Sequence, residues 1–436
     1  MRGQALVIEG FGFGATQGGG AVRFPRPGGG EIAAPVAPPD WNDLAVRATV
    51  PDSAVSGTLT VTTAAGLRLS AVVHVLPRVA FDPATLAWQA RPAFPRAPVG
   101  VAAAAAEFVS GAGLATTVFA AGGAEQIGSR LVPDSGVYVA LAQPGGAIGA
   151  WARQRDLPAP RAFAAAAVAT RYDSRFNGAV LYVIGGIDSS GRAQASVLAA
   201  DVTAGGVASA FGFVEQLPAP VAGAIAVVKR GRIYVIGGTD SLGRPQQSVF
   251  VGRVGVTGHI DGWYLEPALP APRAYGGGAV LDNRAVAFGG LADSVPPGGG
   301  LDTTIVRLAT TDSAAVSLTS GFLTGPWAAG AALLPARRAQ FATLDVGDHL
   351  LAVGGIYPGA GANGAETLAA AVVGDSVGPF AGPVGATMIA GPPNNGGTLV
   401  GPAGVTWRDG DGAHHGLVIG GIDLVSQLRK GGVWGF

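Results

Sequence analysis

The sequence lacks cysteine, and it has only two lysines, Lys229 and Lys430. Without cysteine, the chain cannot form disulfides, thiolate metal sites or cysteine nucleophiles. Basic and acidic residues number 28 each, and charged residues make up only 13% of the chain. This balance leaves no basic surface for nucleic acid or for an anionic membrane. We therefore expect no nucleic-acid partner.

Long apolar runs are also missing. The first residues read MRGQALVIEGFGFG, which has one arginine but lacks the apolar core and cleavage site of a signal peptide. No later run approaches the roughly 18 apolar residues that a membrane helix needs. The chain as given therefore carries no recognisable export signal, and we expect no membrane span. It also has no Asn-Xaa-Ser/Thr glycosylation signal.

Glycine and proline are abundant, at 72 and 31 residues, beside 48% hydrophobic residues. This mixture predicts many tight turns between short buried strands. An apolar run that ends in a glycine pair recurs every 52 to 66 residues, as in 181–192, LYVIGGIDSSGR. The six pairs are Gly122–Gly123, Gly185–Gly186, Gly237–Gly238, Gly289–Gly290, Gly354–Gly355 and Gly420–Gly421. A period of this size is typical of a radial array of small sheets.

A second marker accompanies the glycine pair: an aromatic residue, then an apolar–Pro step, usually followed by arginine. The copies begin at Trp88, Trp151, Phe211, Trp263 and Trp327, with a decayed sixth at Phe380. The two markers together resemble the kelch repeat. That resemblance covers residues 79–436 and implies a β-propeller with one four-stranded blade per repeat, hence six blades.

The last glycine pair is followed by a short segment without an aromatic marker. We therefore expect the strand around Trp88 to complete the blade begun by residues 404–436, which joins the two ends of the array. Alanine-rich runs precede the glycine-pair strands at 101–109, 162–169, 222–228, 275–281 and 340–346. Helix propensity favours helices there, but the repeat alignment predicts strands, the innermost of each blade.

Residues 1–78 do not share this pattern. The segment ALVIEGFGFG is followed by a turn-rich stretch to Asp40, and then by the alternating segments LAVRATVP, GTLTVTT and LSAVVHVLP. They predict a small β-sandwich. The motif resembles the IPT/TIG family of immunoglobulin-like domains, on Ile8, Gly10, Phe13, Gly14, Val50, Pro51, Ser56, Gly57, residues 58–63 and Gly66.

The resemblance departs at its beginning, because family members start with an extra strand and only five residues precede Leu6 here. An open strand edge can pair with another chain. Either the chain is part of a longer polypeptide, or a neighbour supplies the missing strand, or the domain is shortened and tolerates its edge.

The kelch resemblance also includes enzymes, whose site residues can be compared with this sequence. Kelch propellers with an immunoglobulin-like companion include copper radical oxidases similar to galactose oxidase, but these need a cysteine-linked tyrosine, which this chain cannot form. Nothing matches the site of the kelch-type sialic acid mutarotase residue by residue. Arg161, Arg273 and Arg337 resemble the family's structural arginine beside the Leu–Pro turn.

Metal binding has one weak candidate. Residues 408–415, RDGDGAHH, combine Asp409, Asp411, His414 and His415, but alternating Asp and Gly also describe a hairpin turn. The turns DSSGR at 188–192 and DSLGR at 240–244 are near-duplicates in which Asp is expected to cap backbone N–H groups. We assign no catalytic, metal or cofactor-binding residue and no cofactor.

The sequence thus predicts an all-β protein: an IPT/TIG-like sandwich over 1–78 and a six-bladed kelch-like propeller over 79–436. The leading hypothesis is a non-catalytic extracellular module on a prokaryotic cell surface, virion or other assembly. It would bind protein or glycan through the glycine- and proline-rich insertions at 292–302, 356–366 and 381–405.

Two alternatives stay open. A carbohydrate-active enzyme at the propeller mouth predicts converging polar groups there, whereas the leading hypothesis predicts an axis lined by Ala, Gly and Val. An intracellular scaffold fits less well, because the sequence shows no partner domain for that role.

Overall fold

The computed structural model describes the chain except residues 1, 10–11, 44, 97, 111–112, 128–129, 171–177, 256, 294–306, 318–319, 332, 357–365, 386–398 and 424–431. The described residues form antiparallel strands and three single-turn 3-10 helices, Pro38–Asp40, Pro83–Thr85 and Pro144–Gly146. None of the described helices is long and apolar enough to cross a membrane. Contacts divide the chain into two compact units: residues 1–80 with 109–115 and 408–414, and the remainder.

Residues 1–80 build two sheets around one core. The first sheet pairs β1 (Ala5–Glu9) with β4 (Ala45–Thr49), and the second has the order β3 (Glu31–Ala33), β2 (Ala21–Pro25), β5 (Gly57–Thr62), β6 (Arg68–Val73). Both sheets contribute to a single hydrophobic cluster that includes Phe24, Trp41 and Val46. The Trp41 indole N–H donates to the Phe13 carbonyl at 3.1 Å, which anchors the loop that follows β1.

Strands were predicted at β1, β4, β5 and β6, and the structure confirms them. The turn-rich reading of the stretch to Asp40 was wrong, because it contains β2 and β3. In β2, Val22 and Phe24 are buried and alternate with half-buried residues, so the period-two signal was present. The glycines at 28–30, all with positive φ, form the tight turn that pairs the two strands.

The described residues of 81–436 form six sheets of three or more strands, numbered here in chain order. Sheet 1 holds β8 (Ala102–Ser110), β9 (Gly113–Ala121), β12 (Val137–Leu141) and β13 (Ala152–Arg153). Sheet 2 holds β14 (Ala165–Thr170), β15 (Ala179–Ile184), β16 (Val197–Thr203), β17 (Gly206–Val207) and β18 (Gly212–Phe213). Sheet 3 holds β19 (Ile225–Lys229), β20 (Arg232–Ile236), β21 (Val249–Val254) and β22 (Ile260–Glu266).

The other three follow the same plan. Sheet 4 holds β23 (Gly277–Val280), β24 (Arg284–Phe288) and β25 (Thr311–Ala315). Sheet 5 holds β26 (Ala342–Asp345), β27 (His349–Val353), β28 (Thr367–Val373) and β29 (Ser376–Val377). Sheet 6 holds β31 (Ala403–Arg408), β32 (His414–Ile419), β34 (Val433–Gly435) and β7 (Gln89–Arg91). Two-stranded pairs are β10 (Ala124–Ile127) with β11 (Arg130–Pro133), and β30 (Leu399–Val400) with β33 (Ile422–Asp423).

The alanine-rich runs are strands, as predicted. They form β8, β14, β19, β23 and β26, each at one end of its sheet. Helix propensity is a preference of well under 1 kcal/mol per residue, so pairing and packing in a sheet override it.

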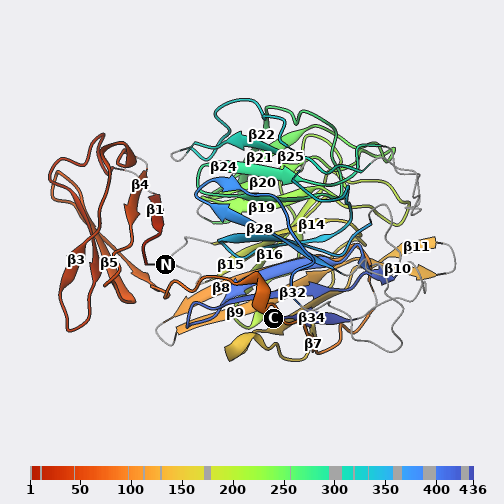
Figure 1. The fold of residues 1–436 in the computed structure, drawn as a ribbon, viewed down its shortest axis with the longest axis horizontal. Helices are drawn as coiled ribbons and strands as arrows, with labels where there is room; N and C mark the ends of the chain where they lie inside the picture. The colour runs from red at the N-terminus through yellow and green to blue at the C-terminus, as the bar shows by residue number, and fades with distance from the viewer. Residues whose placement is uncertain are drawn as a thin grey trace. The chain divides into compact units, whose positions relative to one another are not determined.

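The sheets form a closed series. Each sheet shares a hydrophobic cluster with the next, and sheet 6 shares one with sheet 1 through Leu417 and Val118. In Figure 1 the orange strands β7 and β8 accordingly lie beside the blue strands β32 and β34. Every shared cluster contains one aromatic marker, taken from Trp151, Phe211, Trp263, Trp327, Phe380 and Trp88. The aromatic marker is therefore an element of sheet-to-sheet packing.

Sheet 6 joins the two ends of this unit. Its last strand in sequence, β34, pairs with β7, so that Trp434 lies opposite Ala90. Trp88 donates its indole N–H to Thr367 Oγ1 in sheet 5 at 3.1 Å, and its ring packs edge-on against Phe436.

The glycine pairs connect neighbouring sheets. In every pair the second glycine donates its N–H to a carbonyl at the start of the next sheet, at 2.7 to 3.0 Å. The acceptors, in chain order of the pairs, are Arg161, Val221, Arg273, Arg338, Leu399 and Pro98. The sixth pair reaches back to Pro98, so the six contacts join the sheets into a closed ring. We call each glycine pair with its acceptor carbonyl a glycine clasp.

Only glycine fits the first position of each clasp. Its φ lies between +59° and +72° in all six pairs. A Cβ there would lie 2.1 to 2.8 Å from the same acceptor carbonyl oxygen. Both the left-handed backbone and the close approach exclude a side chain.

Substituting a clasp glycine should cost more than substituting a glycine that has a similar backbone but open surroundings. Gly237 (φ +64°) has the Arg273 carbonyl oxygen 2.1 Å from its Cβ position, whereas Gly191 (φ +78°) has nothing within 4 Å. Gly191→Ala should cost about 1–2 kcal/mol for the left-handed backbone alone. Gly237→Ala should cost about 1–3 kcal/mol more, for the clash. Denaturant unfolding of both variants measures the difference, and equal costs would contradict the clasp.

Candidate functional site

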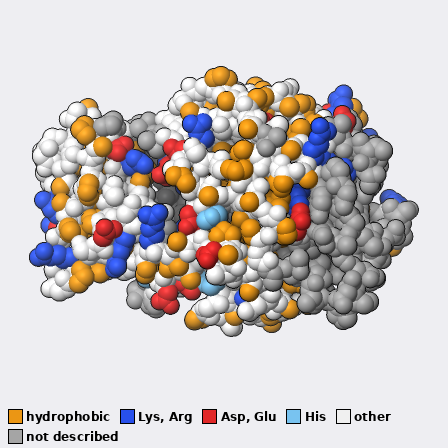
Figure 2. Space-filling view, in the orientation of Figure 1, with side chains coloured by type: hydrophobic (Ala, Val, Ile, Leu, Met, Phe, Trp, Pro, Cys, Tyr) orange, Lys and Arg blue, Asp and Glu red, His pale blue; other side chains and the backbone are white. Residues whose placement is uncertain are grey.

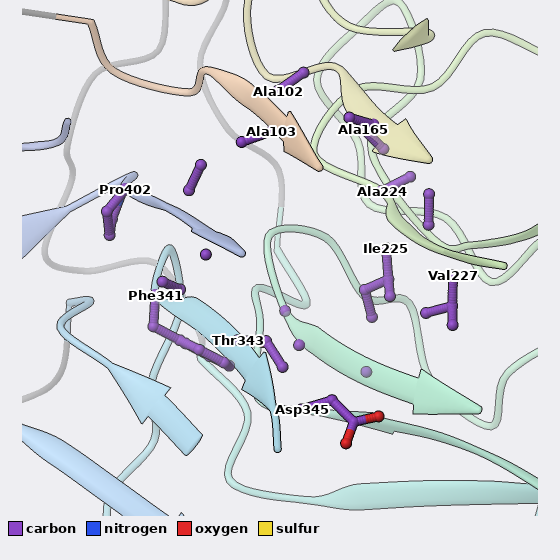
Figure 3. A pocket seen from close by; sticks show the side chains of 18 of the residues that line it. Ala102, Ala103, Ala165, Ala224, Ile225, Val227, Phe341, Thr343, Asp345 and Pro402 are labelled. Atoms are coloured by element: carbon purple, nitrogen blue, oxygen red, sulfur yellow. The ribbon is translucent and has the colours of Figure 1, made fainter. Parts of the chain in front are cut away.

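The first strands of the six sheets surround a cavity of about 300 Å³ (Figure 3). Small and apolar residues line most of it, among them Ala103, Ala165, Ala224 and Gly277. The polar side chains among the lining residues are Thr343, Asp345 and Thr406. The predicted Ala, Gly and Val residues are thus part of the lining, beside Ile225, Phe341 and these three polar side chains.

Asp345 is the one carboxylate that lines this cavity among the described residues, and its position is structural. Oδ1 accepts the backbone N–H of Gly347 at 2.8 Å, which caps the turn between β26 and β27. Among the described residues that line this cavity, Asp345 is accompanied by no second carboxylate, histidine or lysine.

A ring of backbone hydrogen bonds surrounds one end of the axis. The six residues that precede the first strands each donate an N–H to the carbonyl of the previous one, at 2.7 to 2.9 Å. In order they are Gly100, Phe163, Gly223, Tyr275, Gln340 and Gly401, and Gly100 donates to Gly401. All six have positive φ, between +54° and +66°. We call this set the mouth ring.

The mouth ring borders a second cavity of about 140 Å³. Its other lining residues, such as Ala164 and Phe341, also line the larger cavity, so the two cavities are adjacent. Large side chains lie over glycine neighbours: a Cβ on Gly100 would meet the Phe163 ring, and one on Gly223 would meet the Tyr275 ring, both at 2.4 Å. Gly100 and Gly223 therefore make room for the rings of Phe163 and Tyr275.

The two polar side chains of the mouth ring, Tyr275 and Gln340, differ in their hydrogen bonding. Burial raises the pKa of Tyr275 to about 12, against an opposing hydrogen bond from the side chain of Thr239. Tyr275 is therefore neutral at physiological pH. The side-chain oxygen of Gln340 is buried and has no hydrogen-bond partner among the described residues. The sequence analysis assigned no role to Tyr275 and Gln340. Each is the first residue of a run that precedes a glycine-pair strand, 275–281 and 340–346, and this shared position was the signal that could have found them.

The structural arginines are largely as predicted, with one correction. Arg161 and Arg273 are buried at the starts of sheets 2 and 4. In sheet 5 the buried arginine is Arg338, whereas the predicted Arg337 is exposed. Arg338, like Arg161 and Arg273, is the third residue after its Leu–Pro proline, so the spacing held and the assignment was one residue early.

Each buried arginine ties together parts of its own sheet. Arg273 donates to Asp312 at 2.6 Å and to the carbonyl of Gly289, the first glycine of a clasp. Arg338 binds Glu366 and the carbonyl of Gly354 in the same way. Arg161 has Ser196 Oγ as its side-chain partner at 2.7 Å. Burial lowers the pKa of both Arg161 and Arg273.

Adjacent arginines provide a matched test. Arg338→Ala leaves Glu366 without its buried partner and should destabilise the fold by about 3–5 kcal/mol. Arg337→Ala changes an exposed side chain and should stay within about 0.5 kcal/mol of the parent. Thermal unfolding of the two variants decides the assignment, and a larger loss for Arg337→Ala would reverse it.

The weak metal candidate is a hairpin turn. Asp409 Oδ1 accepts the backbone N–H groups of Asp411 and Ala413, both at 3.0 Å. His415 packs its ring against Trp407. No group of three or more His, Asp or Glu side chains able to hold a metal occurs among the described residues.

The two similar turns behave as expected. Asp188 Oδ1 accepts from the N–H groups of Ser190 and Arg192, and Asp240 Oδ1 accepts from those of Leu242 and Arg244. Partial burial opposes ionisation of Asp188, but the hydrogen bonds from Ser190 and Arg192 outweigh it and lower its pKa. Both carboxylates are occupied in capping their own turns.

The three insertions predicted as binding loops, 292–302, 356–366 and 381–405, lie mostly outside the described residues. The structure leaves out residues 294–306, 357–365 and 386–398. On the surface shown in Figure 2, basic, acidic and hydrophobic side chains are interspersed without a field of one sign. This agrees with the zero net charge.

Comparisons with known proteins bear on the fold. No family model matches the chain. Beta-scruin of Limulus polyphemus is 29% identical over 156 residues, a match that covers 35% of this chain and 16% of beta-scruin. A solved structure, "Structure of YjhT", superimposes with a TM-score of 0.51 at 14% identity, over 79% of this chain and 95% of that one. These likenesses support a kelch-type β-propeller.

The propeller assignment gives the parts described above their roles. The sheets are its blades, the cavities lie along its axis, and the glycine clasps and aromatic markers are its blade-to-blade contacts. Because the chain matches only a small part of beta-scruin, the likeness extends to the repeat and no further.

Proposed function

We propose that this chain is a non-catalytic binding or structural module that is exposed on a prokaryotic cell surface, a virion or another extracellular assembly. It engages protein or glycan through the loops of its propeller. The observation that carries the proposal is the axis, where small apolar residues replace the converging polar groups that catalysis needs. Kelch-type propellers act as protein-interaction modules, which supports a binding role.

The architecture we propose is a six-bladed propeller joined to an immunoglobulin-like sandwich. Six sheets, six clasps and six shared clusters among the described residues support six blades. Two sheets around one core support a sandwich in residues 1–80.

Exposed apolar side chains on the outer parts of the blades support contact with a macromolecule. Leu265 in β22 is 72% exposed, Phe213 in β18 is 64% exposed, and Tyr264 beside Leu265 is 46% exposed. Aromatic and large apolar side chains are enriched in protein interfaces.

The alternative, a carbohydrate-active enzyme, has less support. Among the described residues that line the mouth cavity, Tyr275 alone is ionisable. Its pKa of about 12 makes it a poor general acid or base near neutral pH.

Surface exposure has a direct test. An antibody against the purified chain should label intact cells or particles of the source, because the proposed role requires the propeller to face outward. An antibody against an abundant internal protein is the control. Labelling that appears only after permeabilisation would overturn the proposed location.

We also propose that a neighbouring subunit completes the sandwich. In the described chain β1 pairs only with β4, so its other edge is unpaired. Leu69 in β6 pairs with the buried Val61 and so faces the core side, yet it is 39% exposed. A further strand added to this open side would pair the edge and bury that surface.

Light scattering tests this assembly. The purified chain should form multimers larger than its 43.0 kDa mass. Val7→Lys on β1 should return it to a monomer, because a charge on an edge strand blocks strand pairing. Val72→Lys on the outer face of β6 is the control and should leave the multimer intact. A monomeric parent, or a multimer unaffected by Val7→Lys, would contradict the strand addition.

A further inference from the structure

We propose that the mouth cavity is a binding site for a small neutral polyol, of the size and chemistry of a monosaccharide. This site lies on the propeller axis and is separate from the loops on which the proposed function rests. Three observations carry it: an unsatisfied amide, a pair of aromatic rings and the size and neutrality of the cavity.

The amide belongs to Gln340. Its backbone is fixed twice in the mouth ring, as donor to Tyr275 and as acceptor from Gly401, both at 2.9 Å. Its side-chain oxygen is buried without a partner among the described residues. A buried unsatisfied polar group carries a desolvation penalty, which a ligand can relieve. A hydroxyl both donates and accepts, so it satisfies the amide whichever way its oxygen and nitrogen are placed.

The aromatic rings are Phe163 and Tyr275. They line the same cavity as Gln340, both are half-buried, and they meet edge-to-face with centroids 5.5 Å apart. The face of an aromatic ring is negative and attracts the positively polarised hydrogens of a C–H surface. A sugar ring presents such a C–H surface on one side and hydroxyls around its rim, so it can contact a ring and the amide together.

Size and charge narrow the ligand class. The cavity of about 140 Å³ is many times the ~10–15 Å³ that a single water requires. Ala164 and Phe341 line both this cavity and the larger apolar one, so the two are adjacent. Tyr275 is its one ionisable lining residue among those described, and it stays neutral below about pH 12. A charged ligand would lose its hydration without gaining a counter-charge, so a neutral polyol is favoured.

The test titrates the purified chain with D-glucose, D-galactose, D-mannose and N-acetyl-D-glucosamine, and with D-glucuronate as the acidic comparison. Saturation-transfer NMR and calorimetry should detect binding of at least one neutral sugar and weaker binding of D-glucuronate. Gln340→Leu keeps a side chain of similar size at the same left-handed backbone and should weaken that binding at least tenfold. Leu242→Ala changes an exposed side chain that lines neither cavity, and as the control it should leave binding unchanged.

Two results would overturn the proposal: no sugar of the panel binds the parent chain, or binding is the same in Gln340→Leu. If Gln340→Leu does not fold, the position of the sugar in soaked crystals of the parent decides, and density anywhere other than beside Phe163 and Gln340 counts against the site. Failure here leaves the surface-labelling and light-scattering outcomes unaffected, so it is distinguishable from failure of the proposed function.

Discussion

The fold depends on one backbone hydrogen bond that is made six times, from the second glycine of each pair to the first carbonyl of the next blade. The contact is possible only because the preceding glycine has no side chain: its Cβ position is nearly occupied by the same carbonyl oxygen. Buried arginines then hold the first glycine's own carbonyl in the blades that contain Arg273 and Arg338. Five bonds between residues less than one repeat apart in sequence thus link successive blades, and the Gly421–Pro98 bond completes the closure across the ends of the unit.

The clasps also determine what the axis can be. They position the first strands around the axis, where the strands present mainly Ala, Gly and Val beside Ile225, Phe341 and three polar side chains. The mouth ring continues the same constraint, since six residues with left-handed backbones are linked in a circle. Three are glycines, and the rings of Phe163 and Tyr275 lie over Gly100 and Gly223, while Gln340 lines the same cavity. Chemical character on the axis is therefore concentrated at one end, while large apolar side chains such as Leu265 lie on the outer strands.

Prediction succeeded where a feature recurs. The glycine pairs, the alanine-rich strands and the capped turns at Asp188 and Asp240 each appear more than once, so alignment within the chain could outweigh local propensity. It failed where a feature occurs once or is shifted. The strands β2 and β3 were hidden by the glycines of their own turn, and Arg337 was chosen over Arg338 because two arginines stand side by side. Burial separates that pair, and burial is not visible in the sequence.

The sequence by itself determined the repeat: where each glycine pair and its aromatic marker fall, and that the chain is all-β without a thiol or an excess of basic residues. These are properties of spacing and composition, which need no neighbours. Only the tertiary structure decided which residues meet at the axis. Phe163 and Tyr275 are 112 residues apart in the sequence, and Tyr275 and Gln340 are 65 apart. They become neighbours because the backbone hydrogen bonds of the mouth ring link the residues that precede successive first strands. The unsatisfied amide of Gln340 and the rings beside it arise from that convergence, which follows from closing the ring.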